Sequence, residues 1–226
     1  MSALNTGIDL AFVLCAEEAA VAIKCYSPEL MVAPVYCAKS FDEVSNVVSG
    51  DEETKSKREL LVTNMVQKVS DLLPKIHCLI IGPGLGRCPV VFEATARIIK
   101  LAIENDVSMV IDADALFLLS LEKYRNLLKN FGGDEKGSQI ILTPNIVEYE
   151  RLVNAFASTN VDEDNCNNDI FIGTSLEGSI IIRKGQCDSI FRVALPPTRN
   201  IMCADEGGLK VIKPKRISSR VTYFHY

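Results

Sequence analysis

The sequence is poor in the residues that hold metal ions or form paired disulfides. It contains only two histidines, His77 and His225, and its eight cysteines are scattered with no CxxC pair. A structural zinc site uses four such ligands at short spacings, so the pattern argues against one. We expect a reduced intracellular protein without metal-ligand clusters. Cys15 and Cys78 lie inside apolar runs and are predicted to act as small hydrophobic side chains.

Long apolar runs and a basic leader are missing as well. No run approaches the roughly 20 residues that a membrane helix needs. The first apolar stretch has no basic residue ahead of it and has Glu17 and Glu18 directly after it, which argues against a secretory signal. The net charge of −5 and the dispersed basic residues disfavour nucleic acid and anionic membranes as partners. We therefore expect a cytoplasmic protein with no nucleic-acid or membrane partner.

The composition is that of a globular protein with a substantial core. Of the 226 residues, 48% are hydrophobic and 23% are charged. Short β-branched runs alternate with amphipathic stretches, and strands are predicted at residues 10–15, 30–35, 77–82, 107–112, 138–143, 178–185, 187–193 and 200–205. Strands that are apolar throughout and separated by helices indicate an α/β fold, with a mostly parallel sheet and helices on both faces. One domain is the simplest interpretation.

Apolar stripes at helical spacing predict the helices. The first follows a charged segment at 51–59 that is predicted to be a hinge, and polar stretches at 131–137 and 158–168 are predicted to be a turn and a loop. The four stripes are Val62, Met65, Val66, Val69 and Leu73; Val91, Ala94, Ile98 and Leu101; Phe117, Leu121, Tyr124 and Leu128; and Tyr149, Leu152, Val153 and Phe156.

Ligands bind beyond the carboxyl ends of the strands in such a sheet, so the segments that follow strands are the informative ones. The first runs from Gly82 to Arg87 and reads GPGLGR. Glycines allow positive φ and close approach of a ligand, and the following helix N-terminus attracts anions such as pyrophosphate. The spacing matches neither GxGxxG nor GxxxxGK[ST], which excludes a Rossmann fingerprint and a P-loop. A simple tight turn remains the alternative.

Two further strand ends carry carboxylates. Asp112 and Asp114 close the strand 107–112, and the pattern favours Asp114 as the helix N-cap and Asp112 for a functional role, such as Mg²⁺ binding through water. Asn145 is followed three residues later by Glu148, which is close to a capping box. Taken alone, that pair favours capping, with a role at a Mg²⁺–phosphate region as the alternative.

The last motif is a turn between two strands, from Lys184 to Asp188. Lys184 could contact a phosphate, and Gly185 could leave room for a base or ribose. From the sequence alone an ordinary hairpin turn is favoured.

The order of these motifs resembles the ATP-dependent (S)-NAD(P)H-hydrate dehydratase family: GPGLGR, then VIDADAL, LTPNxxE and KGxxD. The first 34 residues are similar too, including YSPEL at Tyr26 to Leu30. We predict a partial family domain over residues 1–210 and a divergent tail over 211–226. The resemblance implies a ribokinase-like fold and a hydro-lyase that uses ATP and Mg²⁺ to restore NADH or NADPH from its hydrate, with release of ADP and phosphate.

The resemblance also implies which residues bind which ligand. Asp112 and Glu148 are expected to hold Mg²⁺ through water. Ile146 stands where the family commonly has histidine, so a polar contact is lost there. The hydrated dinucleotide would contact Gly84, Gly86, Asn145, Ile146, Val147, Glu148, Tyr149, Glu150 and Arg151, and ATP would contact Lys184, Gly185, Gln186, Cys187 and Asp188.

Two family segments are expected to be missing, one at each end of the chain. The family's first strand and its glycine turn should precede Ser2, and its GQGD motif should follow Lys210. That motif provides the Asp expected to act as catalytic base and the N–H groups that hold the transferred phosphate. No aspartate follows Asp205. We therefore assign no catalytic residue, and expect low activity and an uncovered apolar sheet face.

Two other functions stay open. One is a small-molecule kinase of the ribokinase superfamily, although YSPEL and GPGLGR argue against it. The other is a non-catalytic truncated isoform that binds nucleotide weakly or associates with a full-length chain. A homo-oligomer and a mitochondrial form are also compatible with the sequence.

Overall fold

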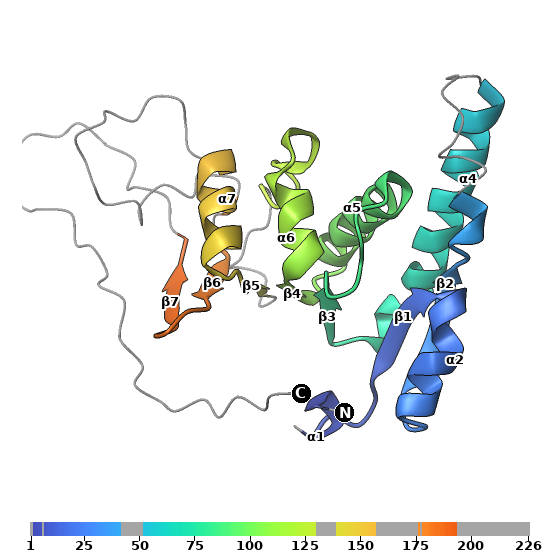
Figure 1. Ribbon diagram of the computed structural model, residues 1–226, viewed down its shortest axis with the longest axis horizontal. Helices are drawn as coiled ribbons and strands as arrows, with labels where there is room; N and C mark the ends of the chain where they lie inside the picture. The colour runs from blue at the N-terminus through green and yellow to red at the C-terminus, as the bar shows by residue number, and fades with distance from the viewer. Residues whose placement is uncertain are drawn as a thin grey trace, which may run out of the picture. The chain divides into compact units, whose positions relative to one another are not determined.

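The computed structural model describes residues 2–5, 7–41, 52–129, 139–156, 176 and 178–193. These residues form two compact units, one within Met1–Ile76 and Arg87–Leu101, the other within His77–Gly86 and Ala102–Tyr226. Each unit contains its own sheet (Figure 1). The predicted boundary at residue 210, strand 200–205, turn 131–137 and loop 158–168 all lie outside the described residues.

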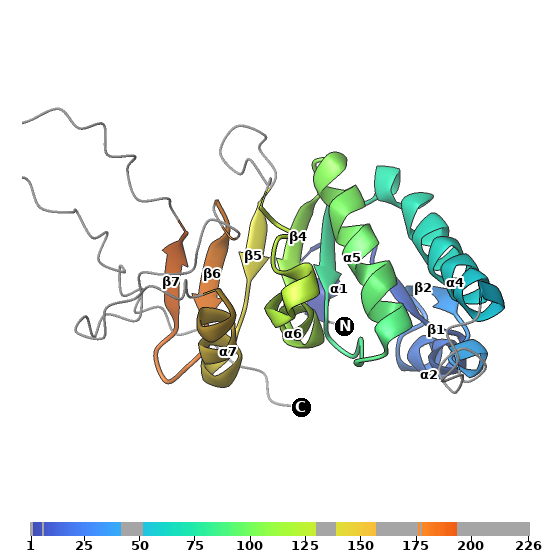
Figure 2. The same ribbon diagram turned by 90° about the horizontal axis from the view of Figure 1, so that it is seen from above.

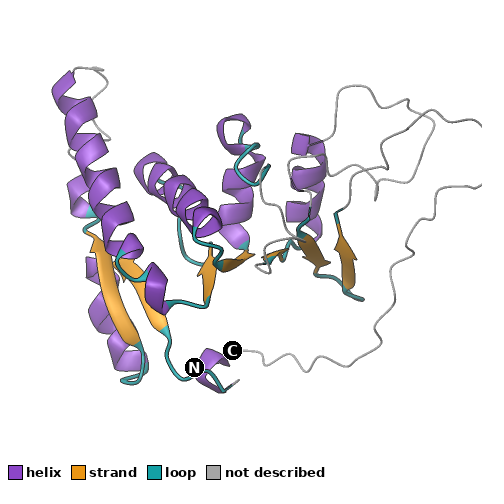
Figure 3. Ribbon diagram, turned by 180° about the vertical axis from the view of Figure 1, so that it is seen from behind, coloured by secondary structure: helices purple, strands orange, loops and turns teal. Residues whose placement is uncertain are grey.

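The first unit contains a β-α-β element that follows a short helix, α1 (Ser2–Asn5). β1 (Phe12–Ala16) pairs in parallel with β2 (Met31–Tyr36), and α2 (Glu17–Tyr26) connects the two strands. The two strands lie side by side in Figure 3. Both strands begin and end close to their predicted ranges.

A long helix, α4 (Glu52–Ser70), contacts β2 and contributes three buried side chains to this unit's core. The predicted hinge at 51–59 is wrong, because residues 52–59 already belong to this helix. Acidic residues suit a helix N-terminus, and the ion pairs Lys55–Glu52 and Lys57–Glu53, at 2.7 and 2.8 Å, join successive turns. The predicted stripe is largely confirmed, since the buried residues are Val62, Met65, Val69 and Leu73, the last in the turn η1 (Leu73–Lys75).

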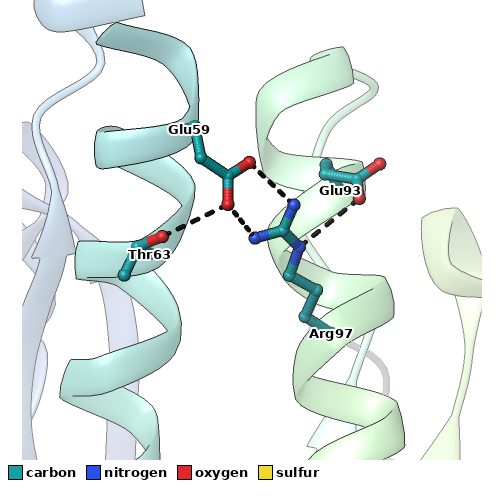
Figure 4. A network of polar contacts seen from close by, with 4 residues as sticks. All are labelled: Glu59, Thr63, Glu93 and Arg97. Carbon is teal, nitrogen blue, oxygen red and sulfur yellow. Dashed lines mark hydrogen bonds and ion pairs between the residues drawn. The ribbon is translucent and has the colours of Figure 1, made fainter. Parts of the chain in front are cut away.

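Arg97 links α4 to α5 (Pro89–Glu104) through a surface network (Figure 4). Its Nη1 and Nη2 lie 2.5 and 2.8 Å from Glu59 Oε1 and Oε2, and its Nε lies 3.4 Å from Glu93 Oε1. The Thr63 hydroxyl also donates to Glu59, at 3.5 Å. The guanidinium lowers the pKa of Glu59, and Glu59 raises the pKa of Arg97. Two parallel charge-assisted hydrogen bonds therefore join α4 to α5.

Glu18 lies in the first turn of α2 and reaches the segment that follows β2. Its Oε2 accepts the Ala38 N–H at 3.1 Å, and its Oε1 accepts the Lys39 N–H and the Cys37 thiol, each at 3.3 Å. Hydrogen bonds from its own backbone N–H, from Ala38 and from Cys37 lower the pKa of Glu18 to about 2. The carboxylate thus connects the first turn of α2 to the segment that follows β2.

Replacing this carboxylate is expected to change how stability depends on pH. The folded-state pKa of Glu18, about 2, lies below the ordinary value of 4.5, so its ionised form stabilises the fold above pH 4.5. That contribution is lost as the pH falls towards 2, and E18Q should lack it. Thermal unfolding of wild type and E18Q across this range measures the difference, with E17Q as the neighbouring control. An unchanged pH profile in E18Q would contradict the proposed bonding.

The second unit is built on a five-stranded sheet in the order β3-β4-β5-β6-β7. The first four strands are parallel and the last is antiparallel, which confirms the mostly parallel α/β fold. β4 to β7 lie side by side in Figure 2. The strands are β3 (Cys78–Ile81), β4 (Ser108–Ile111), β5 (Ile140–Leu142), β6 (Ile180–Arg183) and β7 (Ser189–Arg192).

One face of this sheet holds the core. α6 (Ala113–Ser120) and α7 (Ile146–Phe156) pack together and lie on the same face in Figures 1 and 2. Leu79 and Ile81 are 8% and 7% exposed, whereas Ile80 between them is 63% exposed. Within these strands the buried side chains thus alternate with more exposed ones. The buried face comprises Leu79, Ile81, Met109, Ile111, Ile140, Leu142 and Ile181.

The helix predicted through Phe117, Leu121, Tyr124 and Leu128 is shorter than expected. α6 ends at Ser120, because Leu121 adopts an extended conformation and its N–H bonds to the Leu118 carbonyl. A 3-10 turn, η2 (Glu122–Tyr124), follows. Tyr124 and Leu128 are nevertheless buried, so the stripe marked core positions correctly while the continuous helix was wrong.

The cysteines and the helices relate to two predictions, that the thiols are reduced and that no segment spans a membrane. In the described part of the chain the cysteines are free thiols: Cys15, Cys25, Cys37, Cys78, Cys88 and Cys187. Burial raises the pKa of the Cys15 thiol. Cys78 is exposed, which the apolar run around it did not indicate. Among the helices that are described, none combines the length and apolar character needed to cross a membrane.

Candidate functional site

Four segments that follow strands meet along one edge of the second unit's sheet. β3 to β6 are parallel, so their carboxyl ends share that edge. Backbone bonds join neighbouring segments: Asp112 N–H to Ile81 O at 3.0 Å, Thr143 N–H to Ile111 O at 3.1 Å, and Lys184 N–H to Pro144 O at 2.8 Å. The structure therefore brings together all four motifs that the sequence singled out.

The glycine segment lies close to the Asp112 backbone. Gly82 has φ +126°, and a Cβ built on it would lie 1.7 Å from the Asp112 carbonyl oxygen. Only glycine fits there. Gly84 and Gly86 also have positive φ, +70° and +73°, but a Cβ on either would have no atom within 4 Å. The loop is thus held tightly at its start and has open space at the two glycines predicted to contact a ligand.

Of the two aspartates after β4, the structure has Asp112 and not Asp114 as the helix N-cap. Asp112 is the N-cap of α6, and its Oδ1 accepts the Ala113 N–H at 2.9 Å. Asp114 lies inside the first turn, and its Oδ2 accepts the Gly86 N–H at 3.1 Å. The N-cap prediction was wrong because the helix begins directly after Asp112, with Ala113 at φ +47°. Asp114 therefore anchors the glycine loop.

Asp112 also forms an ion pair across the edge of the sheet. Lys184 Nζ lies 2.9 Å from Asp112 Oδ1, and the two side chains are 40% and 26% exposed. The pair joins the ends of β4 and β6, 72 positions apart in the sequence. No local pattern marks such a pair, and sequence reasoning missed it; the shared edge of parallel strands was the only available signal.

Asn145 and Glu148 form a reciprocal capping box at the start of α7. The Asn145 N–H donates to Glu148 Oε2 at 2.8 Å, and the Glu148 N–H donates to Asn145 Oδ1 at 2.9 Å. The capping interpretation is confirmed. The described residues contain no group of three His, Cys, Asp or Glu side chains arranged for a metal ion.

The run from Asn145 to Arg151 divides into two parts. Asn145, Ile146 and Val147 are exposed at the start of α7, as is Glu150 further along. Tyr149 is buried, with the Arg183 guanidinium 5.1 Å from its ring centre. Arg151 lies over the Phe117 ring at 5.3 Å. The residues at the strand-end edge are thus those of the first turn, while Tyr149 and Arg151 pack within the unit.

The segment from Lys184 to Asp188 is the hairpin turn that the sequence favoured. β6 and β7 pair in antiparallel fashion, and the Gly185 N–H donates to Asp188 Oδ1 at 3.0 Å across the turn. Gly185, Gln186 and Cys187 are exposed. The turn presents its backbone to solvent while Lys184 reaches back to Asp112.

Known proteins match this chain over most of its length. A family model described as NAD(P)H-hydrate dehydratase matches residues 1–209. The ATP-dependent (S)-NAD(P)H-hydrate dehydratase of Nematostella vectensis is 36% identical over 192 residues, covering 84% of this chain and 46% of that protein. The protein of the same name from Arabidopsis thaliana is 37% identical over 191 residues, covering 84% and 48%.

A solved structure is similar at lower identity. A hypothetical protein from Streptococcus mutans is 20% identical, with a TM-score of 0.48 over 84% of this chain and 54% of that one. The chain spans about half the length of the curated relatives it matches. The family match over residues 1–209, together with relatives above 30% identity, means that the chain belongs to the NAD(P)H-hydrate dehydratase family.

Proposed function

We propose that this chain binds hydrated NADH or NADPH together with ATP, and acts in the ATP-dependent dehydration that restores the reduced dinucleotide. The observation that carries the proposal is the meeting of the four family motifs along one sheet edge within one unit. The curated relatives bear the name of this activity. ATP and the hydrated dinucleotide are the two small-molecule partners of the proposal.

The dinucleotide would lie against the glycine loop and the first turn of α7. The open space at Gly84 and Gly86 supports this, since a Cβ added to either residue would have no atom within 4 Å. Asn145, Ile146 and Val147 are exposed in the same unit. Tyr149, which is buried, and Arg151, which lies over the Phe117 ring, would support α7 rather than contact the ligand.

ATP would bind at the hairpin turn from Lys184 to Asp188. An ammonium at a strand end is a good partner for phosphate oxygens. The exposed turn from Gly185 to Cys187, held by Asp188, leaves backbone groups for the remainder of the nucleotide.

The reaction consists of two balanced steps. The γ-phosphoryl group passes from ATP to the ring hydroxyl oxygen of the hydrate, giving ADP, and the hydroxyl proton is released to solvent. The carbon–oxygen bond then breaks, phosphate leaves, and a ring proton is lost to restore the dihydronicotinamide. Such chemistry depends chiefly on positioning and charge stabilisation, which a preformed edge of strand ends can provide. We assign no catalytic base to the described residues.

Mg²⁺ accompanies ATP in the proposal, but Asp112 does not suit it. Its Oδ1 already accepts from the Lys184 ammonium and from the Ala113 N–H, and a second cation beside the ammonium would be repelled. Glu148 remains as a carboxylate that could reach the ion through water, since Mg²⁺ keeps several waters and binds substrate phosphates. A cytoplasmic location, self-association and pairing with a full-length chain also remain predictions.

The test measures dihydronicotinamide absorbance from (S)-NADH hydrate, with and without ATP and Mg²⁺, on the folded 226-residue chain. Calorimetric titrations with ATP and with the hydrate accompany it. ATP-dependent recovery supports the complete proposal, and binding of both ligands without recovery supports only its binding part. Phosphorylated product without elimination would replace it with a kinase, and binding of neither ligand would overturn it.

A further inference from the structure

We propose that Asp112 is a positioning residue of the nucleotide site: its carboxylate holds the Lys184 ammonium in place for a nucleotide phosphate. The inference rests on the proposed ATP site at Lys184. It replaces the metal-binding role that the sequence suggested for Asp112.

Lys184 is held both at its backbone and at the ammonium end of its side chain. Its backbone N–H donates to the Pro144 carbonyl at 2.8 Å, beyond the end of β5. Its Nζ lies 2.9 Å from Asp112 Oδ1, beyond the end of β4. A free lysine side chain loses up to about 2 kcal/mol of rotamer entropy when it is ordered, so a lysine already held in place binds phosphate at lower cost.

Asp112 is itself held rigidly. Its N–H donates to Ile81 O at 3.0 Å, and its carbonyl faces Gly82, where no Cβ could fit. Its Oδ1 also accepts the Ala113 N–H. A residue whose backbone is held against the end of β3, and whose carboxylate caps α6, can set the position of a long side chain, as a preorganised binding site requires.

The ion pair leaves the ammonium able to bind a ligand. An ammonium has three N–H donors, and the bond to Asp112 uses one of them. The Lys184 side chain is 40% exposed at the strand-end edge. Lys184 can therefore keep its bond to Asp112 while donating to a phosphate oxygen.

The test compares ATP affinity in wild type and D112N by isothermal titration of the full chain. Asparagine keeps an oxygen for the Ala113 N–H but removes the charge that holds Lys184. We expect about tenfold weaker ATP binding and unchanged binding of the hydrated dinucleotide. If Asp112 merely neutralised Lys184, D112N would bind ATP more tightly, which is the opposite result. D112S is the second variant, because serine is also a good N-cap.

A double-mutant cycle shows whether Asp112 acts through Lys184. K184M should weaken ATP binding, and adding D112N to K184M should then cause no further loss. A further loss in the double variant would overturn the inference, as would unchanged affinity in D112N. If wild type itself binds no ATP, the proposed function and this inference both fail. If wild type binds ATP and D112N binds it equally well, only this inference fails.

Discussion

Replacing Gly82 with alanine is expected to destabilise the protein by about 2 kcal/mol or more. The new Cβ would lie 1.7 Å from the Asp112 carbonyl oxygen and 2.7 Å from its carbonyl carbon. Both contacts are with backbone, so no side-chain rotation can relieve them. The φ of +126° also lies outside the region that alanine tolerates. Denaturant unfolding followed by circular dichroism measures the loss.

G84A is the matched control within the same loop. Gly84 has φ +70°, close to the left-handed helical region, and a Cβ there would meet no atom within 4 Å. Its cost should be the intrinsic one of about 1 kcal/mol. Because Gly82 adjoins Asp112, G82A should also weaken ATP binding through the displaced Lys184. Equal stability losses in G82A and G84A would show that the close approach at Asp112 does not constrain the fold.

Local patterns in the sequence predicted local structure well. The Asn145–Glu148 spacing predicted a capping box, and both of its hydrogen bonds are present. Apolar periodicity placed Val62 and Met65 in the core of the first unit. The error at 51–59 arose because a dense run of charges was interpreted as a hinge, whereas ion pairs between successive turns make the same run a good helix start.

Long-range contacts could not be predicted in the same way. Whether Asp112 or Asp114 caps α6 depends on where β4 ends, and the sequence pattern favoured the wrong one, Asp114. The pairing of Asp112 with Lys184 depends on β5 lying between β4 and β6 in the sheet order. The motif order indicated the family, and that assignment is confirmed, but the ligand contacts of Gly84, Asn145 and Lys184 stay predictions.

Shortening Ile111 to alanine is expected to cost about 2–5 kcal/mol of unfolding free energy. Ile111 is completely buried in β4, next to Ile81 of β3 and Leu142 of β5 in the sheet. A cavity there has packed side chains around it that cannot collapse fully. Denaturant unfolding measures the loss. If the dependence of the unfolding free energy on denaturant concentration is unchanged, the loss belongs to the folded state.

I80A is the matched control, because it removes the same atoms from the opposite face of the sheet. Ile80 is 63% exposed, so the loss should stay below about 1 kcal/mol. The ratio of the two losses in unfolding free energy compares the burial of the two faces of the second unit's sheet. If I80A costs as much as I111A, the face that carries Ile80 is covered in solution by another chain or segment. If I80A instead raises solubility with little loss of stability, that face is an apolar surface open to solvent.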